Sequence, residues 1–503
     1  MSNPNAISDR LTQRWTPYVL VALIGVTTAV LGVATGFPCP QVDDAIYKSP
    51  AAELVQHGRF AIPCGTGYFA RAGEVFACYP PIFPLVISAW YRVFDFSLSS
   101  SLAFMYAIHL GTALLLMTLA ERWSGDCDGI SRGAQRYLVS VVGLTHISNL
   151  AFFDRQEELA LLFVLLQLLF VRQVVLCGIL LGIAGLTSPW VGILGTLVFV
   201  GNQLVLWWRG EAALRGIGRQ LAVGGLAALL TAGSWFAYME WSHPGIINDQ
   251  FLGHMRHLRE TQIHDGLLGH LKLLVGSLLY DSPHLLAGLS VLVMFPLAVR
   301  ELGGRRFSAL ALAVYGACCL GILAASVLRP KAYTYLGVAQ MLLLPCLVPA
   351  VGRYFSRTAT GWNWEACVAA VVLLAATVFS FKDTVRVAVG VMTLPAAEQR
   401  DTVEARLAAV IPPGERVAVT ARHWHLFQGR NPWREAYFVS IGNPDEIRGC
   451  EWLVLRPGIG LPPFIDEFEL VEEQASNAHY NRTYAYSVWR RKSPAAVSVA
   501  FGG

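Results

Sequence analysis

The chain has 503 residues, of which 54% are hydrophobic and only 14% charged, and its formal net charge is +4. Soluble domains carry roughly 25% charged residues, so this composition excludes an ordinary soluble protein and indicates an integral membrane protein whose main partner is the lipid bilayer. A net charge this small, with no basic run, gives no reason to expect a nucleic-acid partner.

Apolar stretches long enough to cross a bilayer, about 17 to 25 residues each, recur along residues 1–382. With the N-terminus in the cytoplasm and the C-terminus outside, every short inner loop contains an arginine, as membrane topology requires. We therefore predict a polytopic α-helical protein with about 11 transmembrane helices. The expected spans are Pro17–Gly36, Ser101–Ala120, Tyr137–Phe153, Glu158–Val171, Val174–Leu186, Trp190–Trp208, Gln220–Met239, Pro283–Ala298, Phe307–Leu328, Tyr333–Val351 and Asn363–Phe381.

The first long outer loop, residues 37–100, begins with an acidic pair, Asp43 and Asp44, followed by Tyr47. Side-by-side carboxylates in a plain linker would repel each other without any gain, whereas a reaction site at the membrane surface could use them. A solvated helix N-terminus, where acidic residues favour the helix dipole, explains the pair equally well. We expect this helix to end at Gly58.

Later in the same loop, Pro80 and Pro81 precede an apolar run that ends at Phe94. Because a helix tolerates proline in its first turn, we predict a helix from about Pro81. Its tryptophan, tyrosine and arginine residues suit an interfacial helix that lies along the bilayer, with a short buried membrane span as the alternative. The loop also contains Cys39, Cys64 and Cys78, which would permit one disulfide outside the cytosol.

Several charged residues lie at outer ends of the predicted spans. Arg155 and Glu157 form a charged turn after the third span, where Arg155 could pair with Asp43, with a phosphate, or with an acidic neighbour in its own turn. Arg329 and Lys331 break the rule that positive charge collects inside, so they are candidate phosphate contacts; a lysine that anchors its span at the interface is the alternative for Lys331.

The second outer loop, residues 240–281, is rich in histidine. His254 and His257 have the i, i+3 spacing that places two side chains on one helical face. A metal site there needs a third ligand, and none is marked, so we favour contact with substrate and expect no metal, with a divalent ion as the less favoured alternative.

Residues 383–503 have the composition of a soluble domain. We predict strands at Glu415–Thr420, Glu451–Leu455 and Tyr484–Trp489, and a helix at Asp401–Val410. This pattern indicates a small C-terminal α/β domain on the extracytoplasmic side.

Together these features resemble the GT-C class of membrane glycosyltransferases, in particular the protein O-mannosyltransferases and the aminoarabinose transferases of lipid A. The resemblance covers the membrane part, roughly Pro17 to Phe381. The matching residues are Asp43, Asp44 and Tyr47 with Gly58, the Pro80-Pro81 helix, Arg155 with Glu157, and Arg329, Lys331, Tyr333 and Tyr335 before a late span. One position departs from the pattern: the aminoarabinose transferases have a phosphate-binding lysine where this chain has Tyr79.

The resemblance implies an inverting, metal-independent glycosyltransferase that uses a polyprenyl-phosphate sugar donor and an extracytoplasmic lipid, glycan or protein acceptor. Asp43 would be the general base, and Asp44 would orient it or share its role. Lys331, Arg329 and Arg155 would bind the donor phosphate. The expected substrate contacts are Tyr47, Glu157, Tyr333, Tyr335, His254 and His257.

The expected location is the bacterial inner membrane. Two other classes stay possible at this point: a lipid or solute transporter or flippase, and a non-catalytic membrane scaffold. A transporter would often show two related halves with charges at mid-membrane. This chain shows no such repeat, and its ionisable residues gather at the outer ends of the spans.

Overall fold

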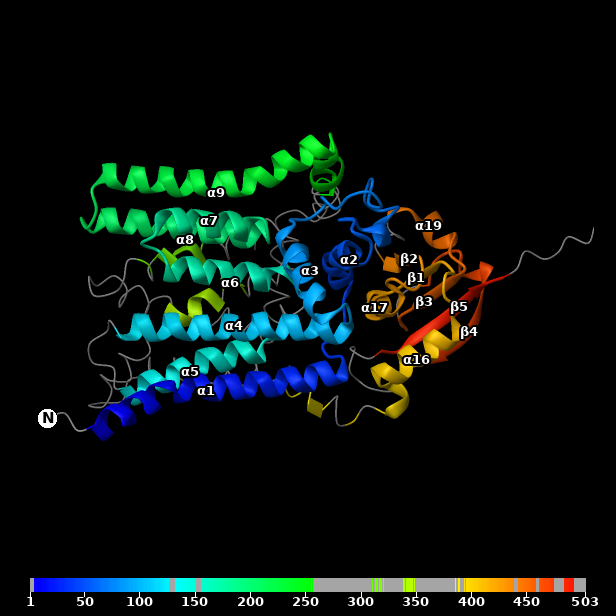
Figure 1. The fold of residues 1–503 in the computed structure, drawn as a ribbon, viewed down its shortest axis with the longest axis horizontal. Helices are drawn as coiled ribbons and strands as arrows, with labels where there is room; N and C mark the ends of the chain where they lie inside the picture. Colours follow the sequence, from blue (N-terminus) through cyan, green and yellow to red (C-terminus); the bar gives the residue numbers. More distant parts are fainter. Residues whose placement is uncertain are drawn as a thin grey trace, which may run out of the picture.

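The computed structural model describes residues 4–125, 132–150, 155–254, 395–437, 442–457, 461–474 and 484–492, together with short runs between 256 and 393. Seven of the described helices lie side by side and run lengthwise through one half of the molecule (Figure 1). They are α1 (Pro4–Thr35), α4 (Leu98–Gly125), α5 (Arg132–Ser148), α6 (Gln156–Leu169), α7 (Val174–Gly185), α8 (Pro189–Trp208) and α9 (Leu214–Ser242).

Four of these helices contain a segment long and apolar enough to cross a membrane: Trp15–Thr35, Leu98–Ser124, Pro189–Trp208 and Leu214–Ser242. Each of the first seven predicted spans overlaps one of the seven helices. Six agree within six residues at each end, while α1 begins at Pro4 and not at Pro17. The last four predicted spans lie outside the described residues, apart from short runs, so the count of eleven stays a prediction.

Close packing in this bundle depends on small residues. Gly178 and Gly182 of α7 face α9, where an added Cβ at Gly178 would clash with the carbonyl oxygen of Gly224. Membrane helices associate through such small residues because they let two backbones approach closely.

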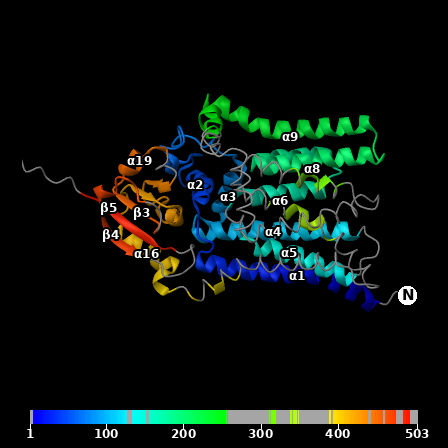
Figure 2. The ribbon, with the colours of Figure 1, turned by 180° about the vertical axis from the view of Figure 1, so that it is seen from behind.

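Two helices from the first loop lie across one end of the bundle, α2 (Val42–His57) and α3 (Ile82–Phe94) (Figures 1 and 2). Helix α2 ends at Gly58, which has a left-handed backbone conformation with φ of 70°, as predicted. Helix α3 follows Pro81 and has 13 residues. At 1.5 Å per residue it is roughly 20 Å long, too short for a hydrocarbon core of about 30 Å, so the interfacial interpretation is favoured.

The C-terminal residues form a five-stranded sheet beyond α2 and α3, with the strand order β2-β1-β3-β5-β4. The strands are β1 (Val417–Val419), β2 (Trp433–Glu435), β3 (Trp452–Leu455), β4 (Phe468–Gln474) and β5 (Tyr486–Arg491). Strand β1 is parallel to β2 and β3, and β5 is antiparallel to β3 and β4; Val454, for example, pairs with Val488.

Three helices accompany the sheet: α16 (Arg400–Val410), α17 (Trp424–Phe427) and α19 (Pro444–Arg448). The helix expected at 401–410 and the three expected strands are confirmed within two residues at each end. Strands β1 and β3 are buried along their whole length, as the inner strands of a covered sheet should be.

One apolar core joins the first loop to the sheet. Phe83 and Tyr91 of α3 belong to the same buried cluster as Trp424 and Tyr486 of the C-terminal part. The C-terminal part therefore packs directly on α3 and on α2, the helix that carries the acidic pair. In this core, Cys39, Cys64 and Cys78 are buried, and the disulfide that the loop would permit is not formed.

Candidate functional site

Asp43 and Arg155 form an ion pair at the end of the helix bundle. Asp43 lies in the first turn of α2, and Arg155 is the residue that precedes α6. Nη2 of Arg155 lies 2.7 Å from Oδ2 of Asp43, and the two side chains are 33% and 28% exposed. Of the partners that the sequence left open for Arg155, the structure shows Asp43.

The neighbouring carboxylate, Asp44, has a different environment. Its side chain is 1% exposed and forms a salt bridge with Lys48, one helical turn later. Its Oδ2 also accepts a hydrogen bond of 3.0 Å from Nε1 of Trp424, in α17. Each member of the acidic pair therefore has its own cation, and this arrangement relieves the repulsion that adjacent carboxylates would otherwise suffer.

Tyr47 is buried between the two loop helices. Its ring meets that of Tyr79 edge-on at a centroid distance of 5.1 Å and that of Phe83 at 6.3 Å. Burial raises the pKa of Tyr47 well above its usual value; Asp43, Tyr79 and Glu157 raise it further, while Arg155 lowers it. The phenol thus stays protonated and able to donate a hydrogen bond.

Glu157 lies in the first turn of α6 and is 2% exposed. Asp43, Glu157 and Arg155 all shift the pKa of Tyr47, and Arg155 also pairs with Asp43, so the site combines residues from two segments more than 100 positions apart. This cluster of Asp43, Tyr47, Arg155 and Glu157 is the candidate site.

His254 ties the second outer loop to the first. Its Nε2 lies 2.9 Å from the hydroxyl of Tyr79, so the position where the aminoarabinose transferases have a lysine is here a tyrosine hydrogen-bonded to histidine. Gln250 adds further bonds: it accepts from the amide of Ala77 at 2.7 Å and donates to the carbonyl of Val75 at 3.0 Å. These contacts fix the residues beside Tyr47.

Five predicted site residues lie outside the described part of the chain: His257, Arg329, Lys331, Tyr333 and Tyr335.

The structure adds residues that the sequence analysis missed. Lys48 follows Asp44 at the i, i+4 spacing typical of helical ion pairs, a signal that was present in the sequence. Trp424 gave no signal, because it is separated from Asp44 by 380 positions. Its neighbour His425 is also buried in the interface, with Nε2 3.1 Å from the hydroxyl oxygen of Ser101 at the start of α4.

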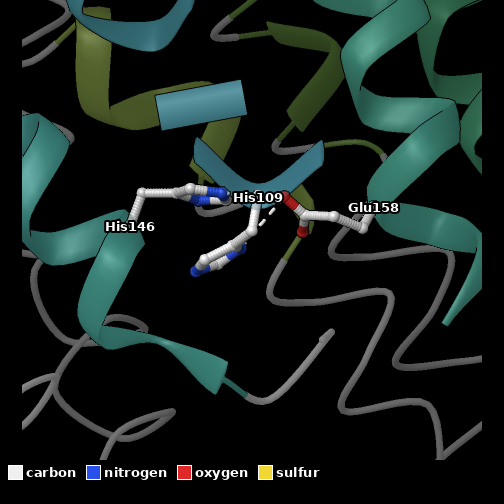
Figure 3. Close-up of side chains that lie close together, drawn as sticks. All are labelled: His109, His146 and Glu158. Carbon is white, nitrogen blue, oxygen red and sulfur yellow. Dashed lines mark hydrogen bonds and ion pairs between the residues drawn. The ribbon is translucent and has the colours of Figure 1, made fainter. Parts of the chain in front are cut away.

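A second cluster lies inside the helix bundle, next to the candidate site in sequence. His109, His146 and Glu158 come from α4, α5 and α6, and one potential ligand atom from each lies within 4.8 Å of the others (Figure 3). Within the described part of the chain this is the only group of three or more histidine, cysteine or acidic side chains that could hold a metal ion.

No family model matches the chain, and no curated protein matches it in sequence. Among solved structures, ArnT from Cupriavidus metallidurans, bound to undecaprenyl phosphate, is similar with a TM-score of 0.54 and 16% identity, over 94% of this chain and 97% of that one. The oligosaccharyltransferase of Archaeoglobus fulgidus gives a TM-score of 0.47 and 12% identity, over 87% of this chain and 67% of that one. The arabinofuranosyltransferase AftD from Mycobacteria gives 0.47 and 14%, over 94% of this chain and 40% of that one. The chain thus shares its fold with ArnT, and four of its described helices are long and apolar enough to cross a membrane, as in an integral membrane protein.

Proposed function

We propose that the protein transfers a sugar from a polyprenyl-phosphate donor to an extracytoplasmic acceptor, with inversion and with Asp43 as the general base. The observation that carries this proposal is the partly exposed Asp43 carboxylate, held by Arg155 beside the buried Tyr47 and Glu157. A chain of similar fold that was solved with undecaprenyl phosphate supports the choice of donor.

In this reaction Asp43 takes the proton from the acceptor hydroxyl while the hydroxyl oxygen of the acceptor attacks the anomeric carbon of the donor sugar. The bond from that carbon to the phosphate oxygen breaks, and its electron pair leaves with the phosphate. Asp44 is buried against Lys48 and Trp424, so it serves as a positioning residue that holds the first turn of α2, not as a second base.

The leaving phosphate carries developing negative charge that cations stabilise. Arg155 is suited to this role because a guanidinium has five N–H donors and can bind a carboxylate and a phosphate at the same time. Arg329 and Lys331 would complete the phosphate site, which lets the transfer proceed without a metal ion.

Tyr47, Glu157 and His254 would contact the donor sugar or the acceptor, together with Tyr333, Tyr335 and His257. For such a reaction we place the site on the outer face of a bacterial inner membrane, with the N-terminus in the cytoplasm and the sheet outside.

The test compares the purified full-length protein with its Asp43→Asn variant, using radiolabelled polyprenyl-phosphate sugars. Asparagine keeps the shape of aspartate but cannot accept the proton, so donor binding should persist while transfer or slow donor hydrolysis falls by about 100-fold or more. Glu74→Gln is the matched control, because Glu74 forms an exposed pair with Arg71 in the same loop.

Unchanged turnover in Asp43→Asn would exclude Asp43 as the base. If the wild-type protein bound no donor but moved a labelled lipid across reconstituted vesicles, the transporter interpretation would replace the enzyme. If it neither bound donor nor transported, the scaffold interpretation would stand.

A further inference from the structure

Three helices of the bundle each contribute one polar side chain to a buried cluster. His109 is on α4, His146 is near the end of α5, and Glu158 is in the first turn of α6 (Figure 3). Their exposed fractions are 1%, 0% and 1%. Ionisable groups at such positions in a membrane protein are costly, so they are paired or serve a purpose.

Hydrogen-bond directions in the cluster call for a shared cation. Nε2 of His109 lies 3.3 Å from the carbonyl oxygen of Ile147. A carbonyl only accepts, so this nitrogen carries the hydrogen, and in a neutral imidazole Nδ1 then has a lone pair. That Nδ1 lies 3.2 Å from Oε1 of Glu158, which also only accepts when ionised. In the tautomer that donates to Ile147, a positive ion, either a proton or a metal, lies between them.

The donor set and its spacing favour a metal. Two histidines and one glutamate form a zinc set known from sites that keep a fourth position for water, and ligands with bonds of about 2.0–2.1 Å to a tetrahedral ion lie about 3.3 Å apart. Here the Oε1 atom of Glu158 lies 3.2 Å from His109 and 2.8 Å from Nε2 of His146. The carbonyl partner of His109 is also the kind of contact that orients a metal-bound histidine.

A proton alone leaves part of the cluster unsatisfied. Oε2 of Glu158 is buried and has no hydrogen-bond partner in the part of the chain that the structure describes. A metal ion would give Oε2 a partner, because a carboxylate can bind through both oxygens.

We propose that His109, His146 and Glu158 form a structural site for a divalent transition metal, with zinc the best fit. The ion would tie α4, α5 and α6 together and neutralise Glu158 inside the bundle. Since Glu158 follows Arg155 by three residues, the site would also fix the start of α6, which holds the guanidinium against Asp43. The ion takes no part in the transfer proposed above, so the two proposals stand or fall separately.

The first test measures metal content in the purified full-length protein. We expect about one zinc per chain after washing with a weak chelator, and loss of that zinc in His109→Gln and Glu158→Gln. His57→Gln is the control, because His57 is 46% exposed and lies outside the cluster. Zn²⁺ added to chelator-stripped protein should raise the Tm of the wild type and of His57→Gln, but not of the two cluster variants.

Because a cluster variant could fail to fold, a second measurement uses the wild type alone. Stripped protein titrated with Co²⁺ should develop the visible ligand-field bands of a four- or five-coordinate nitrogen and oxygen site, saturating near one equivalent, and Zn²⁺ should abolish them. No metal in the purified protein, no change in Tm with Zn²⁺ and no cobalt bands would overturn the proposal and assign the bridging charge to a proton. Zinc retained in a folded Glu158→Gln variant would overturn it as well.

Discussion

Nε1 of Trp424 donates a hydrogen bond of 3.0 Å to Asp44, a residue 380 positions earlier in the chain. With the salt bridge from Lys48, this bond satisfies a carboxylate that is 1% exposed. The C-terminal part therefore supplies one of the groups that hold the first turn of α2, and with it Asp43.

Replacing Trp424 by phenylalanine removes the donor but keeps most of the aromatic surface. A hydrogen bond to a charged group contributes about 1.5–3 kcal/mol, so Trp424→Phe should lower the free energy of unfolding by about that amount. It should also lower the transfer rate, since α2 loses its support. Trp433→Phe is the matched control: its Nε1 donates to the neutral Gln428 at 2.9 Å, and it should cost about 1 kcal/mol with transfer unchanged. Equal effects of the two variants would contradict a special role for Trp424.

Removing the cation from the buried pair should be more damaging than removing the pair. Lys48→Met leaves Asp44 as an unpaired buried charge and should cost about 3–5 kcal/mol. In the double variant Asp44→Asn/Lys48→Met no charge is left, while an amide oxygen still accepts from Trp424, so part of that stability should return. Thermal unfolding of both variants in detergent measures this difference; a double variant less stable than Lys48→Met would refute the assignment.

Arg155 should matter for catalysis far more than for stability. Its pair with Asp43 is partly exposed, so Arg155→Ala should change the free energy of unfolding by about 1 kcal/mol or less. A misplaced base and a lost phosphate contact should lower kcat/KM by about 100-fold. Arg71→Ala, which removes another exposed pair in the outer loops, should leave kcat/KM unchanged. Steady-state kinetics on the two variants tests this prediction. Equal kcat/KM values for Arg155→Ala and Arg71→Ala would show that Arg155 has no role in the transfer.

Stability should fall as the solution becomes acidic, partly through His423. Burial, and then the charge of Arg422, lowers the pKa of His423 to about 3. In the unfolded chain its pKa is about 6.5, so between these values the unfolded state binds a proton that the folded state does not. The stability contributed above pH 6.5 is therefore lost as the pH falls, at up to about 1.4 kcal/mol per pH unit.

The variant His423→Gln removes this titration, so its Tm should fall less between pH 7 and pH 5 than that of the wild type. Some pH dependence should persist, because burial also lowers the pKa of His425. An unchanged pH dependence in His423→Gln would show that His423 does not contribute.

Local patterns in the sequence predicted the local structure well. The ends of α2 and α3 followed from Gly58 and Pro81, because the turn chemistry of glycine and proline acts on the neighbouring backbone. The sequence left three partners open for Arg155, and Asp43 was one of them. Contacts between distant segments could not be derived: nothing near Trp424 indicates Asp44 as its partner.

The histidines inside the spans are a further example. The i, i+3 spacing singled out the outer-loop histidines, whereas His109 and His146 look like isolated residues in apolar runs. Only the packing of three helices shows that they share Glu158. Because Asp43 and Asp44 are adjacent in the sequence, we expected them to share one role. Consecutive residues of a helix point in different directions, so Asp43 pairs with Arg155 and Asp44 pairs with Lys48.

The bond between Asp44 and Trp424 also sets an order in time. At about 5–20 residues per second, the 380 residues between them take roughly 20 to 80 s to translate. During that interval the first turn of α2, which contains Asp43, lacks its hydrogen bond from Trp424. On the proposed function, a growing chain would therefore become active only after the segment that contains Trp424 has packed against α2.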